Sequence, residues 1–283
     1  AVSVCATYLG LTTIFAIVSA PLIPLADEIT TRAYRRRSEQ GRYGQVRFWG
    51  SLGFVVAVVG TGAAIDTWGY SIVPSALLVS CVSLACASFF LPDDISWQHP
   101  VLDQSPRQIS PARMSLFRHQ YLPYWVTVLT SALIQSSHAA YYAYGTIYFT
   151  SYGVSSSAAG WLWAEGIVLE MAVFLLGAPL LRTGYRYQFL MLAAVAGVCR
   201  WGAVALWPSL PVFVATQWLH GVTFGVSHLT VMVLIREQVP EPQLAARAYS
   251  LHMAVSSSVV MGLATLGAAH AYRSTPQDAF LLM

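Results

Sequence analysis

Two glutamates and an arginine lie inside long apolar stretches of the sequence, where an ionisable side chain is costly and is usually functional. Glu165 and Glu170 share one stretch, and Arg200 lies in the next. Because arginine keeps its charge, a buried Arg200 requires a carboxylate or an anionic ligand, and either glutamate could supply the carboxylate. Burial favours the protonated carboxyl group, whereas a nearby cation favours the carboxylate. A glutamate that approaches and leaves a cation would bind and release a proton, whereas a fixed pair would only join two helices.

The spacing of the two glutamates gives them different surroundings. Five residues at about 100° each place Glu165 and Glu170 about 140° apart around a helix, so they cannot share one face. One can face a cavity while the other packs against a neighbouring helix. We expect Glu170 to couple proton binding to function, and we keep Glu165 as a second candidate.

Histidines occur in the same apolar stretches, and a side chain that titrates near neutral pH suits proton relay. Gln217, His220, Phe224 and His228 follow one another at helical spacing and share one face. The two histidines are eight residues apart, which is too far along the axis for both to chelate one metal. We expect His220 and His228 to face a cavity.

A second polar face runs through Gln135, His138, Tyr142 and Gly145. A polar face on an otherwise apolar helix points into the helical bundle or into a water-filled cavity. The first three side chains are therefore candidate substrate ligands. The alternative is a tyrosine-rich packing face with one satisfied histidine.

Catalytic motifs are absent from the sequence. Neither GxSxG nor HExxH occurs, and the four cysteines lie in apolar runs without a CxxC pair. We expect the protein not to be an enzyme, and to have no metal and no cofactor.

The composition requires a membrane. Of 283 residues, 56% are hydrophobic and only 10% are charged, which excludes disorder and an ordinary soluble domain. The mean hydropathy is +0.58, and the net charge of +3 is too small to suggest binding to nucleic acid. Eight apolar runs are long enough to cross a bilayer of about 30 Å as helices: 1–26, 48–65, 67–91, 120–151, 154–181, 187–206, 210–235 and 248–271. The predicted fold is an all-α, polytopic membrane bundle of about eight helices.

The arginines predict the orientation, because basic loops stay in the cytoplasm. Thirteen of the fifteen arginines fall in alternate loops on one side: Arg32, Arg35, Arg36, Arg37, Arg42, Arg47, Arg107, Arg113, Arg118, Arg182, Arg186, Arg236 and Arg247. Only Arg273 lies on the other side. We expect a multi-pass protein of the inner (plasma) membrane whose arginine-rich loops are cytoplasmic.

The only long loop, 92–119, contains four prolines and is typical of a cytoplasmic linker between two bundles. The predicted domains are therefore the remainder of an N-terminal bundle (1–91), the linker (92–119) and a C-terminal bundle (120–283).

One segment, Tyr43–Ser51, resembles the YGxVRxWGS signature of 3-phenylpropionate-type permeases of the major facilitator superfamily. Further segments resemble this family: Pro21–Asp27, His138–Tyr142, Gly160–Trp163, Arg200–Gly202 and His220–Phe224. The resemblance implies a twelve-helix fold, of which this chain would be a fragment spanning the fourth to eleventh helices and the start of the twelfth. It places the linker in the cytoplasm, in agreement with the arginines.

A more distant resemblance is to lactose permease-like transporters. It implies that Asp27 and Arg47 bind substrate. It also implies that Glu170, Arg200 and His220 couple transport to protons, whereas Glu165 has no clear counterpart in the phenylpropionate-type pattern.

The expected function is proton-coupled symport of a small organic solute, by alternating access between two bundles. The resemblance suggests an aromatic carboxylate such as 3-phenylpropionate. Tyrosines 141, 142 and 144 could stack on a ring, and Arg47 or Arg200 could pair with the carboxylate. The expected partners are the substrate, protons and the lipid bilayer, and the protein is expected to be a monomer.

Two alternatives stay open. The first is symport of a sugar or nucleoside by the same mechanism. The second is a membrane sensor without transport activity, or an inactive fragment.

Overall fold

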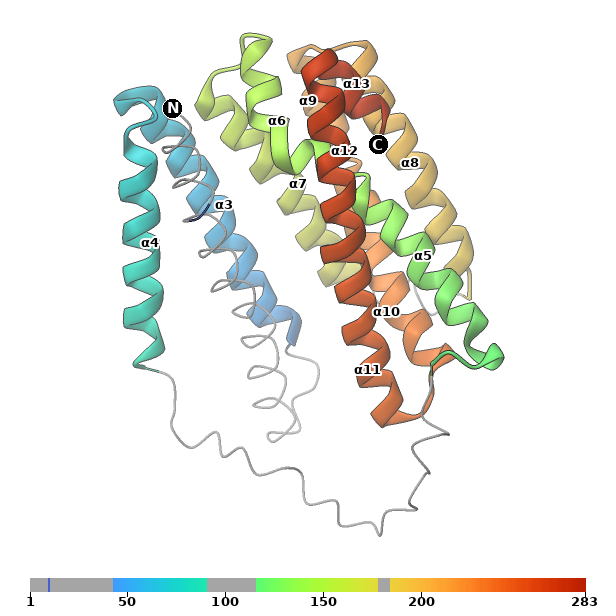
Figure 1. The fold of residues 1–283 in the computed structure, drawn as a ribbon. Coiled ribbons are helices and arrows are strands. Elements are labelled where there is room, and N and C mark those ends of the chain that lie inside the picture. The colour runs from blue at the N-terminus through green and yellow to red at the C-terminus, as the bar shows by residue number, and fades with distance from the viewer. Residues whose placement is uncertain (1–9, 11–42, 91–115, 178–183) are drawn as a thin grey trace. The chain divides into compact units, whose positions relative to one another are not determined.

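The computed structural model of the chain describes residues 10, 43–90, 116–177 and 184–283 (Figure 1). Asp27 lies outside these ranges, together with nearly all of the apolar run 1–26 and most of the linker. Arg47 lies in a helix, but the position of its side chain is not described. The substrate-binding roles predicted for Asp27 and Arg47 therefore stay predictions.

The described residues form helices joined by short connections, which confirms the all-α fold class. In chain order the helices are α3 (Tyr43–Trp68), α4 (Ile72–Ser88), η3 (His119–Tyr121), α5 (Leu122–Ser136), α6 (Ala139–Ser151), α7 (Ser156–Leu176), α8 (Arg186–Leu206), α9 (Leu210–Gln217), η5 (Gly221–Val226), α10 (Ser227–Gln238), α11 (Pro242–Met253), η6 (Ala254–Val260), α12 (Met261–Ser274) and α13 (Pro276–Leu281).

Five helical segments in the described part are long and apolar enough to cross a membrane: Phe48–Trp68, Ser156–Leu176, Arg186–Leu206, Leu210–Gln238 and Arg247–Ser274. They correspond to five of the eight predicted spans. Of the other three, the run 67–91 contains the shorter apolar helix α4, 120–151 is divided between α5 and α6, and 1–26 lies almost wholly outside the description.

The chain divides into two compact units. One comprises Ala1–Gly50 and Ser83–Asp103, and the other comprises Ser51–Val82 and Gln104–Met283. In the first unit, the rings of Phe48 and Trp49 meet edge to face with their centroids 5.8 Å apart. The second unit contains every other contact described below. The predicted bundle boundaries at 91 and 120 stay a prediction.

The expected continuous helix over 120–151 is wrong, because the chain breaks at Ser137 and His138. The Nδ1 atom of His138 lies 3.2 Å from the carbonyl oxygen of Ile134 and 3.3 Å from that of Gln135. The Ser137 hydroxyl also donates to the Ile134 carbonyl, at 2.7 Å. The Gln135 carbonyl also accepts the backbone N–H of His138, at 3.1 Å. Side-chain contacts of this kind compensate for the interruption of a helix in an apolar environment.

Two long spans contain π-helical turns. The turn η5 directly follows His220, and η6 begins two residues after His252. π turns are rare and occur frequently at functional sites. The rings of His220, Phe224 and His228 still share one face across η5. The ring centroid of Phe224 lies 5.4 Å from that of His220 and 5.9 Å from that of His228.

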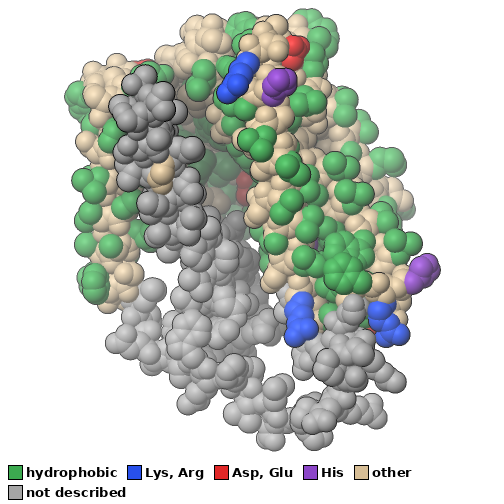
Figure 2. Space-filling model, in the orientation of Figure 1, with side chains coloured by type: hydrophobic (Ala, Val, Ile, Leu, Met, Phe, Trp, Pro, Cys, Tyr) green, Lys and Arg blue, Asp and Glu red, His purple; other side chains and the backbone are tan. Residues whose placement is uncertain are grey.

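The side chains between the helices of the second unit form two apolar clusters. One is centred on Tyr148, Phe149 and Phe213, and α13 contributes Phe280, which is 1% exposed. The other joins α5, α8, α10 and α11 around Tyr124 and Leu234. Many large apolar side chains are also exposed. Figure 2 shows hydrophobic atoms along the right-hand part of the visible face, with basic side chains near its upper and lower ends. This distribution suits a lipid environment.

The helices α3 and α7 touch through their backbones. A Cβ atom on Gly62 would lie 2.5 Å from the carbonyl oxygen of Ser156, and one on Gly160 would lie 2.6 Å from that of Val58. Glycine is therefore required at both positions, because any side chain would force the helices apart. The carboxylate of Asp66, on α3, also joins the two helices. It accepts hydrogen bonds from the backbone N–H groups of Ser156 and Ser157 in the first turn of α7.

Candidate functional site

The guanidinium of Arg200, on α8, is the centre of a buried polar cluster, and the residue is 0% exposed. Its Nη1 atom donates to Nδ1 of His220 at 3.0 Å and to Oγ1 of Thr223 at 3.2 Å. Its Nη2 atom donates to Oε1 of Gln217 at 3.0 Å. All three of these acceptors lie in the span 210–238, which passes α8.

His220 connects Arg200 to Glu170. Arginine can only donate hydrogen bonds, so the Nδ1 of His220 must be an acceptor, and a neutral His220 carries its proton on Nε2. That Nε2 lies 3.5 Å from Oε2 of Glu170. Both residues are buried, with 3% and 7% of their surface exposed. The arrangement is a linear series of a cation, a histidine with one defined tautomer and a carboxyl group.

Thr223 connects the cluster to the break between α5 and α6. Its hydroxyl accepts from Arg200 and lies 3.1 Å from Nε2 of His138. Because the Nδ1 of His138 faces two carbonyl oxygens, that nitrogen is the donor, and Nε2 accepts the Thr223 proton. Every hydrogen in this part of the network therefore has one consistent position.

Glycines bring α7 close to the polar span. A Cβ atom on Gly166 would lie 3.4 Å from Oε1 of Gln217 and from Cβ of His220. A Cβ atom on Gly221 would lie 3.2 Å from the carbonyl oxygen of Leu169. These small residues allow the approach that places Glu170 beside His220.

Aromatic rings enclose the guanidinium. Its Cζ atom lies 5.0 Å from the ring centroid of Tyr141 and 4.3 Å from that of Trp201, within the range of cation–π attraction. The Tyr141 hydroxyl donates to Oε1 of Gln217 at 3.1 Å. The rings exclude water from the ion and hold the acceptor Gln217 in position.

The structure brings together several of the residues predicted from the sequence. His138, Glu170, Arg200 and His220 lie in one network, and Tyr142 stacks on His138 with ring centroids 5.6 Å apart. Gln135 is also buried, and its backbone carbonyl oxygen lies beside the Nδ1 atom of His138.

Glu165 and His228 have other neighbours. Glu165 accepts a hydrogen bond from the side chain of Trp218. The ring of His228 lies between those of Phe224 and Phe174, at 5.9 and 6.0 Å. The two glutamates of α7 thus have different surroundings, as the 140° estimate requires.

Three members of the network were not among the predicted site residues, namely Tyr141, Gln217 and Thr223. A signal for two of them was present, because Gln217 and Thr223 each lie three residues from His220 and so share its side of a helix. No comparable signal identified Tyr141, which the sequence offered only as one of several tyrosines able to stack on a ring.

A second buried histidine lies apart from this network. His252, 3% exposed, places Nε2 2.9 Å from the hydroxyl of Ser131 and 3.4 Å from that of Ser256. Its Nδ1 has no hydrogen-bond partner among the described residues. Within the same residues, no three His, Cys, Asp or Glu side chains gather as metal ligands.

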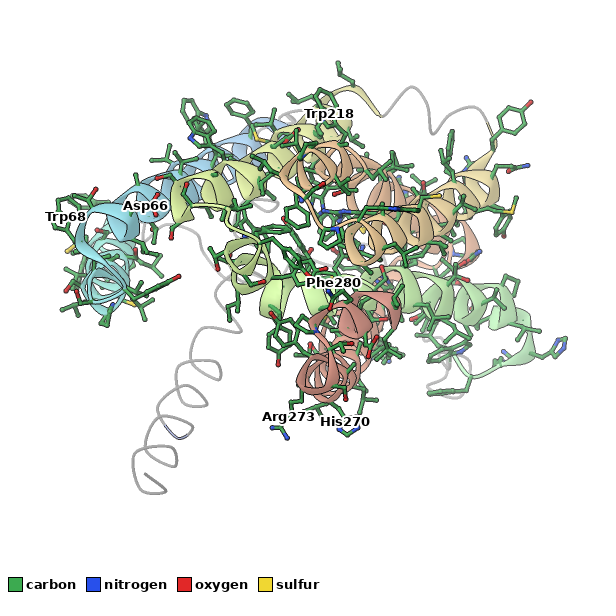
Figure 3. All side chains as sticks on the ribbon, turned by 90° about the horizontal axis from the view of Figure 1, so that it is seen from above. Asp66, Trp68, Trp218, His270, Arg273 and Phe280 are labelled. Carbon is green, nitrogen blue, oxygen red and sulfur yellow. The ribbon has the colours of Figure 1, made fainter. Side chains whose placement is uncertain are left out.

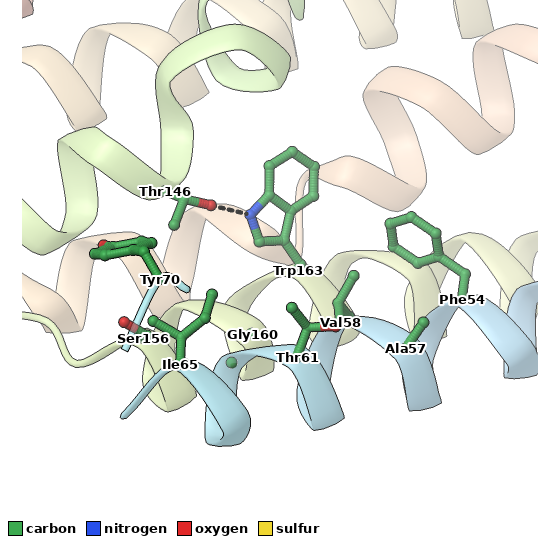
Figure 4. Close-up of a pocket in the computed structure, with 11 residues that line it drawn as sticks. Phe54, Ala57, Val58, Thr61, Ile65, Tyr70, Thr146, Ser156, Gly160 and Trp163 are labelled. Atoms are coloured by element: carbon green, nitrogen blue, oxygen red, sulfur yellow. Dashed lines mark hydrogen bonds between the residues drawn. The ribbon is translucent and has the colours of Figure 1, made fainter. Parts of the chain in front are cut away.

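A pocket of about 450 Å³ lies between α3, α6 and α7 (Figure 4). Its walls are mostly apolar and include the rings of Phe54, Tyr70 and Trp163. The indole nitrogen of Trp163 donates to Oγ1 of Thr146 at 3.0 Å, as Figure 4 shows. The indole also stacks on Tyr141, with ring centroids 4.1 Å apart. Two stacked rings, Trp163 and Tyr141, therefore connect the wall of the pocket to the Arg200 network.

The fold and the site together define a class of protein. Apolar helices of membrane-spanning length surround buried ionisable side chains, and these gather where α5–α6 and α9–η5 are interrupted. Discontinuous helices around a polar site are typical of transporters. The chain is thus a multi-pass membrane protein of the transporter class.

The chain belongs to the MFS_1-like family of the major facilitator superfamily, whose family model matches residues 2–282. Its members transport small molecules across membranes and are not enzymes. The resemblance inferred from the Tyr43–Ser51 signature is thereby confirmed.

Three curated relatives are similar over most of the chain. A probable 3-phenylpropionic acid transporter of Escherichia coli (strain K12) is 30% identical over 95% of this chain and 68% of its own length. The maltose permease of Geobacillus stearothermophilus is 25% identical over 92% of this chain and 63% of its own length. The uncharacterized transporter YwbF of Bacillus subtilis (strain 168) is 24% identical over 86% and 58%. The chain thus spans about two thirds or less of each relative. No solved structure matches it.

Proposed function

We propose that the transporter to which this chain belongs takes up a small aromatic carboxylate together with a proton. The buried series Arg200–His220–Glu170 is the observation that carries the proposal. The relative named as a probable 3-phenylpropionic acid transporter supports the class of substrate, and 3-phenylpropionate is the first compound to test.

The coupling follows from the charges of the series. While Glu170 is ionised, its negative charge balances Arg200 across the neutral ring of His220. A proton on Glu170 removes this balance and leaves a buried cation hydrogen-bonded to neutral acceptors, which is an expensive state. An anionic substrate then restores neutrality near the cation. Proton and anion therefore bind favourably together and poorly alone, which is the thermodynamic requirement for symport.

Alternating access would expose this site to one side of the membrane at a time. We further propose that the protein lies in the plasma (inner) membrane, with its arginine-rich loops and the linker in the cytoplasm. In this proposal the transporter is a monomer. In this scheme Gln135, His138 and Tyr142, with Asp27 and Arg47, belong to the substrate-binding cavity. Glu165 and His228 are supporting candidates for proton movement.

The test is uptake of labelled 3-phenylpropionate by cells that express the complete gene, with and without a protonophore. We expect accumulation that collapses when the protonophore is added. The variant Glu170→Gln should lose accumulation against a gradient but retain exchange of labelled for unlabelled substrate, because it cannot release a proton.

Glu165→Gln is the matched control, since Glu165 lies on the same helix but contacts Trp218 instead of His220. As a supporting candidate only, it should reduce accumulation much less than Glu170→Gln does. Normal accumulation by Glu170→Gln would refute the assignment of the coupling residue. Absence of wild-type uptake, with the protein shown to be in the membrane, would refute the substrate class.

A second candidate is proton symport of a sugar, which the similarity to a maltose permease favours. Competition separates the two candidates. If the substrate is a sugar or nucleoside, unlabelled sugars or nucleosides would block uptake of the labelled compound and aromatic acids would not. A sensor without transport activity, or an inactive fragment, would show no flux of either compound even from the complete gene.

A further inference from the structure

We propose that the pocket between α3, α6 and α7 binds the aromatic ring of the transported acid, with Trp163 as the surface on which the ring stacks. This inference rests on the proposed function and assigns one part of the substrate to one place. At about 450 Å³, the pocket lies within the range of small-molecule sites.

The walls favour a ring over a sugar. Phe54 and Trp163 offer aromatic faces, Val58 adds aliphatic surface between them, and Ile65 adds more beside Tyr70 (Figure 4). Aromatic rings gain from offset or edge-to-face contact with such walls. A sugar would bring many hydroxyl groups into a mostly apolar space, where each unpaired group carries a desolvation cost.

Trp163 is held in place before any ligand arrives. Its nitrogen is engaged by Thr146 at 3.0 Å, and one side of the indole is occupied by Tyr141 at 4.1 Å. Figure 4 shows the indole among the residues that line the pocket. A ring held in one orientation loses little freedom when a ligand stacks on it, which favours affinity.

The position of Trp163 also explains how an occupied pocket could act on the coupling residues. Tyr141 packs on Trp163 and contacts the Arg200 guanidinium at 5.0 Å. Its hydroxyl additionally binds Gln217, which accepts from Arg200. A ligand stacked on Trp163 would therefore be separated from the buried cation by two rings, Trp163 itself and Tyr141.

Alkylation of a single cysteine tests whether the ring enters the pocket. Thr61 lies in the wall, so we would place Thr61→Cys in the complete protein with its native cysteines changed to serine, and measure labelling by N-ethylmaleimide. We expect 3-phenylpropionate to slow labelling about tenfold, cyclohexylpropionate to slow it less, and maltose to have no effect. Ser151→Cys, on an exposed residue outside the pocket, should label at the same rate with or without each compound.

The matched substitutions are Trp163→Leu and Trp161→Leu. Both remove an indole from α7, but Trp161 is 63% exposed and does not line the pocket. Trp163→Leu should raise the KM for 3-phenylpropionate about tenfold and abolish protection of the cysteine introduced by Thr61→Cys, while Trp161→Leu should do neither.

The outcomes separate the two proposals. Protection of the introduced cysteine without accumulation by the wild type would support the ring site and refute proton-coupled uptake. Accumulation with no protection, or with equal effects of the two tryptophan substitutions, would refute the ring site alone. A Thr61→Cys variant that cannot be labelled even without ligand would also refute it, because the pocket would then be filled by another part of the protein.

Discussion

The Nη1 atom of Arg200 donates a hydrogen bond to the Nδ1 atom of His220 across 3.0 Å, inside a helical bundle and out of contact with solvent. This one contact fixes the tautomer of the histidine, because an arginine cannot accept. A second proton on His220 would have to occupy the nitrogen that Arg200 already uses. We therefore propose that the exchangeable proton of the series is carried by Glu170.

Arg200→Lys should impair transport although the charge is kept. A lysine ammonium is a point donor and cannot reproduce the fork that reaches Gln217, His220 and Thr223 together. We expect uptake to fall at least about tenfold and the protein to lose about 2–4 kcal/mol of stability. Uptake assays and thermal melting in detergent measure the two effects. Arg236→Lys, at an exposed position on α10, should leave both unchanged, and equal behaviour of the two variants would contradict the role of the fork.

Thr223→Val tests the bridge between Arg200 and His138. Valine has nearly the same shape but leaves a donor of Arg200 and the Nε2 of His138 unpaired, at a cost of about 1–3 kcal/mol. Thr230→Val is the matched control, because Thr230 is equally buried in the same span but donates only to its own helix, at the Val226 carbonyl. The melting temperature of Thr223→Val should be well below that of Thr230→Val. A reversed order would show that the bridge contributes little.

Gly160→Ala should separate α3 from α7. The new methyl group would lie 2.6 Å from a backbone oxygen, which cannot move without the whole helix, so the overpacking cost is about 1–3 kcal/mol. Gly53→Ala on α3 meets nothing within 4 Å and should be neutral or slightly stabilising, because alanine favours helices. Melting temperature and uptake rate distinguish them, and full tolerance of Gly160→Ala would mean that the two helices are not in contact in the working protein.

Asp66→Ala should also weaken the contact between α3 and α7, because it removes a carboxylate on α3 that binds the first turn of α7. The carboxylate accepts from the backbone N–H groups of Ser156 at 2.9 Å and Ser157 at 2.8 Å, at the N-terminus of α7 (Figure 3). Its loss removes two hydrogen bonds and a favourable interaction with the helix dipole, so the melting temperature should fall. Asp66→Asn keeps one acceptor oxygen and should lie between Asp66→Ala and the wild type in a melting assay. An asparagine variant less stable than the alanine variant would exclude this explanation.

The pH gradient alone should drive uptake if one proton accompanies one monoanion. Such a cycle moves no net charge, so the membrane potential contributes nothing to it, although each uncompensated charge would gain about 2.3 kcal/mol per 100 mV. In proteoliposomes, an inward proton gradient should produce accumulation, whereas a potassium-diffusion potential with valinomycin should not. Accumulation driven by the potential would require more than one proton per substrate.

The sequence predicted the membrane-spanning character and the helical fold, because both follow from composition and from the length of apolar runs. It also identified the costly residues, since a charge in an apolar run is visible without coordinates. Glu170, Arg200, His138 and His220 were named on this ground, and they lie in one network in the structure. Their functional roles remain predictions that the experiments above address.

Tertiary structure decided which of these residues touch. From spacing alone, either Glu165 or Glu170 could meet Arg200. The register of α7 against the span 210–238 places Glu165 beside Trp218 and Glu170 beside His220. The break at His138 was also not predicted, because the hydrophobic pattern of 120–151 continues through it. The side-chain contacts of Ser137 and His138 with the carbonyls of Ile134 and Gln135, which compensate for the interruption, are visible only in the tertiary structure.

Hydrophobic pattern is a property of each segment, so the sequence by itself determined the apolar helical segments and the presence of buried charge. Pairing across helices depends on rotation and depth, which glycines such as Gly62, Gly160 and Gly166 set through backbone contact. The tertiary structure therefore decided the tautomer of His220, the neighbour of each glutamate and the pocket beside Trp163, because each of these requires atoms from at least two helices.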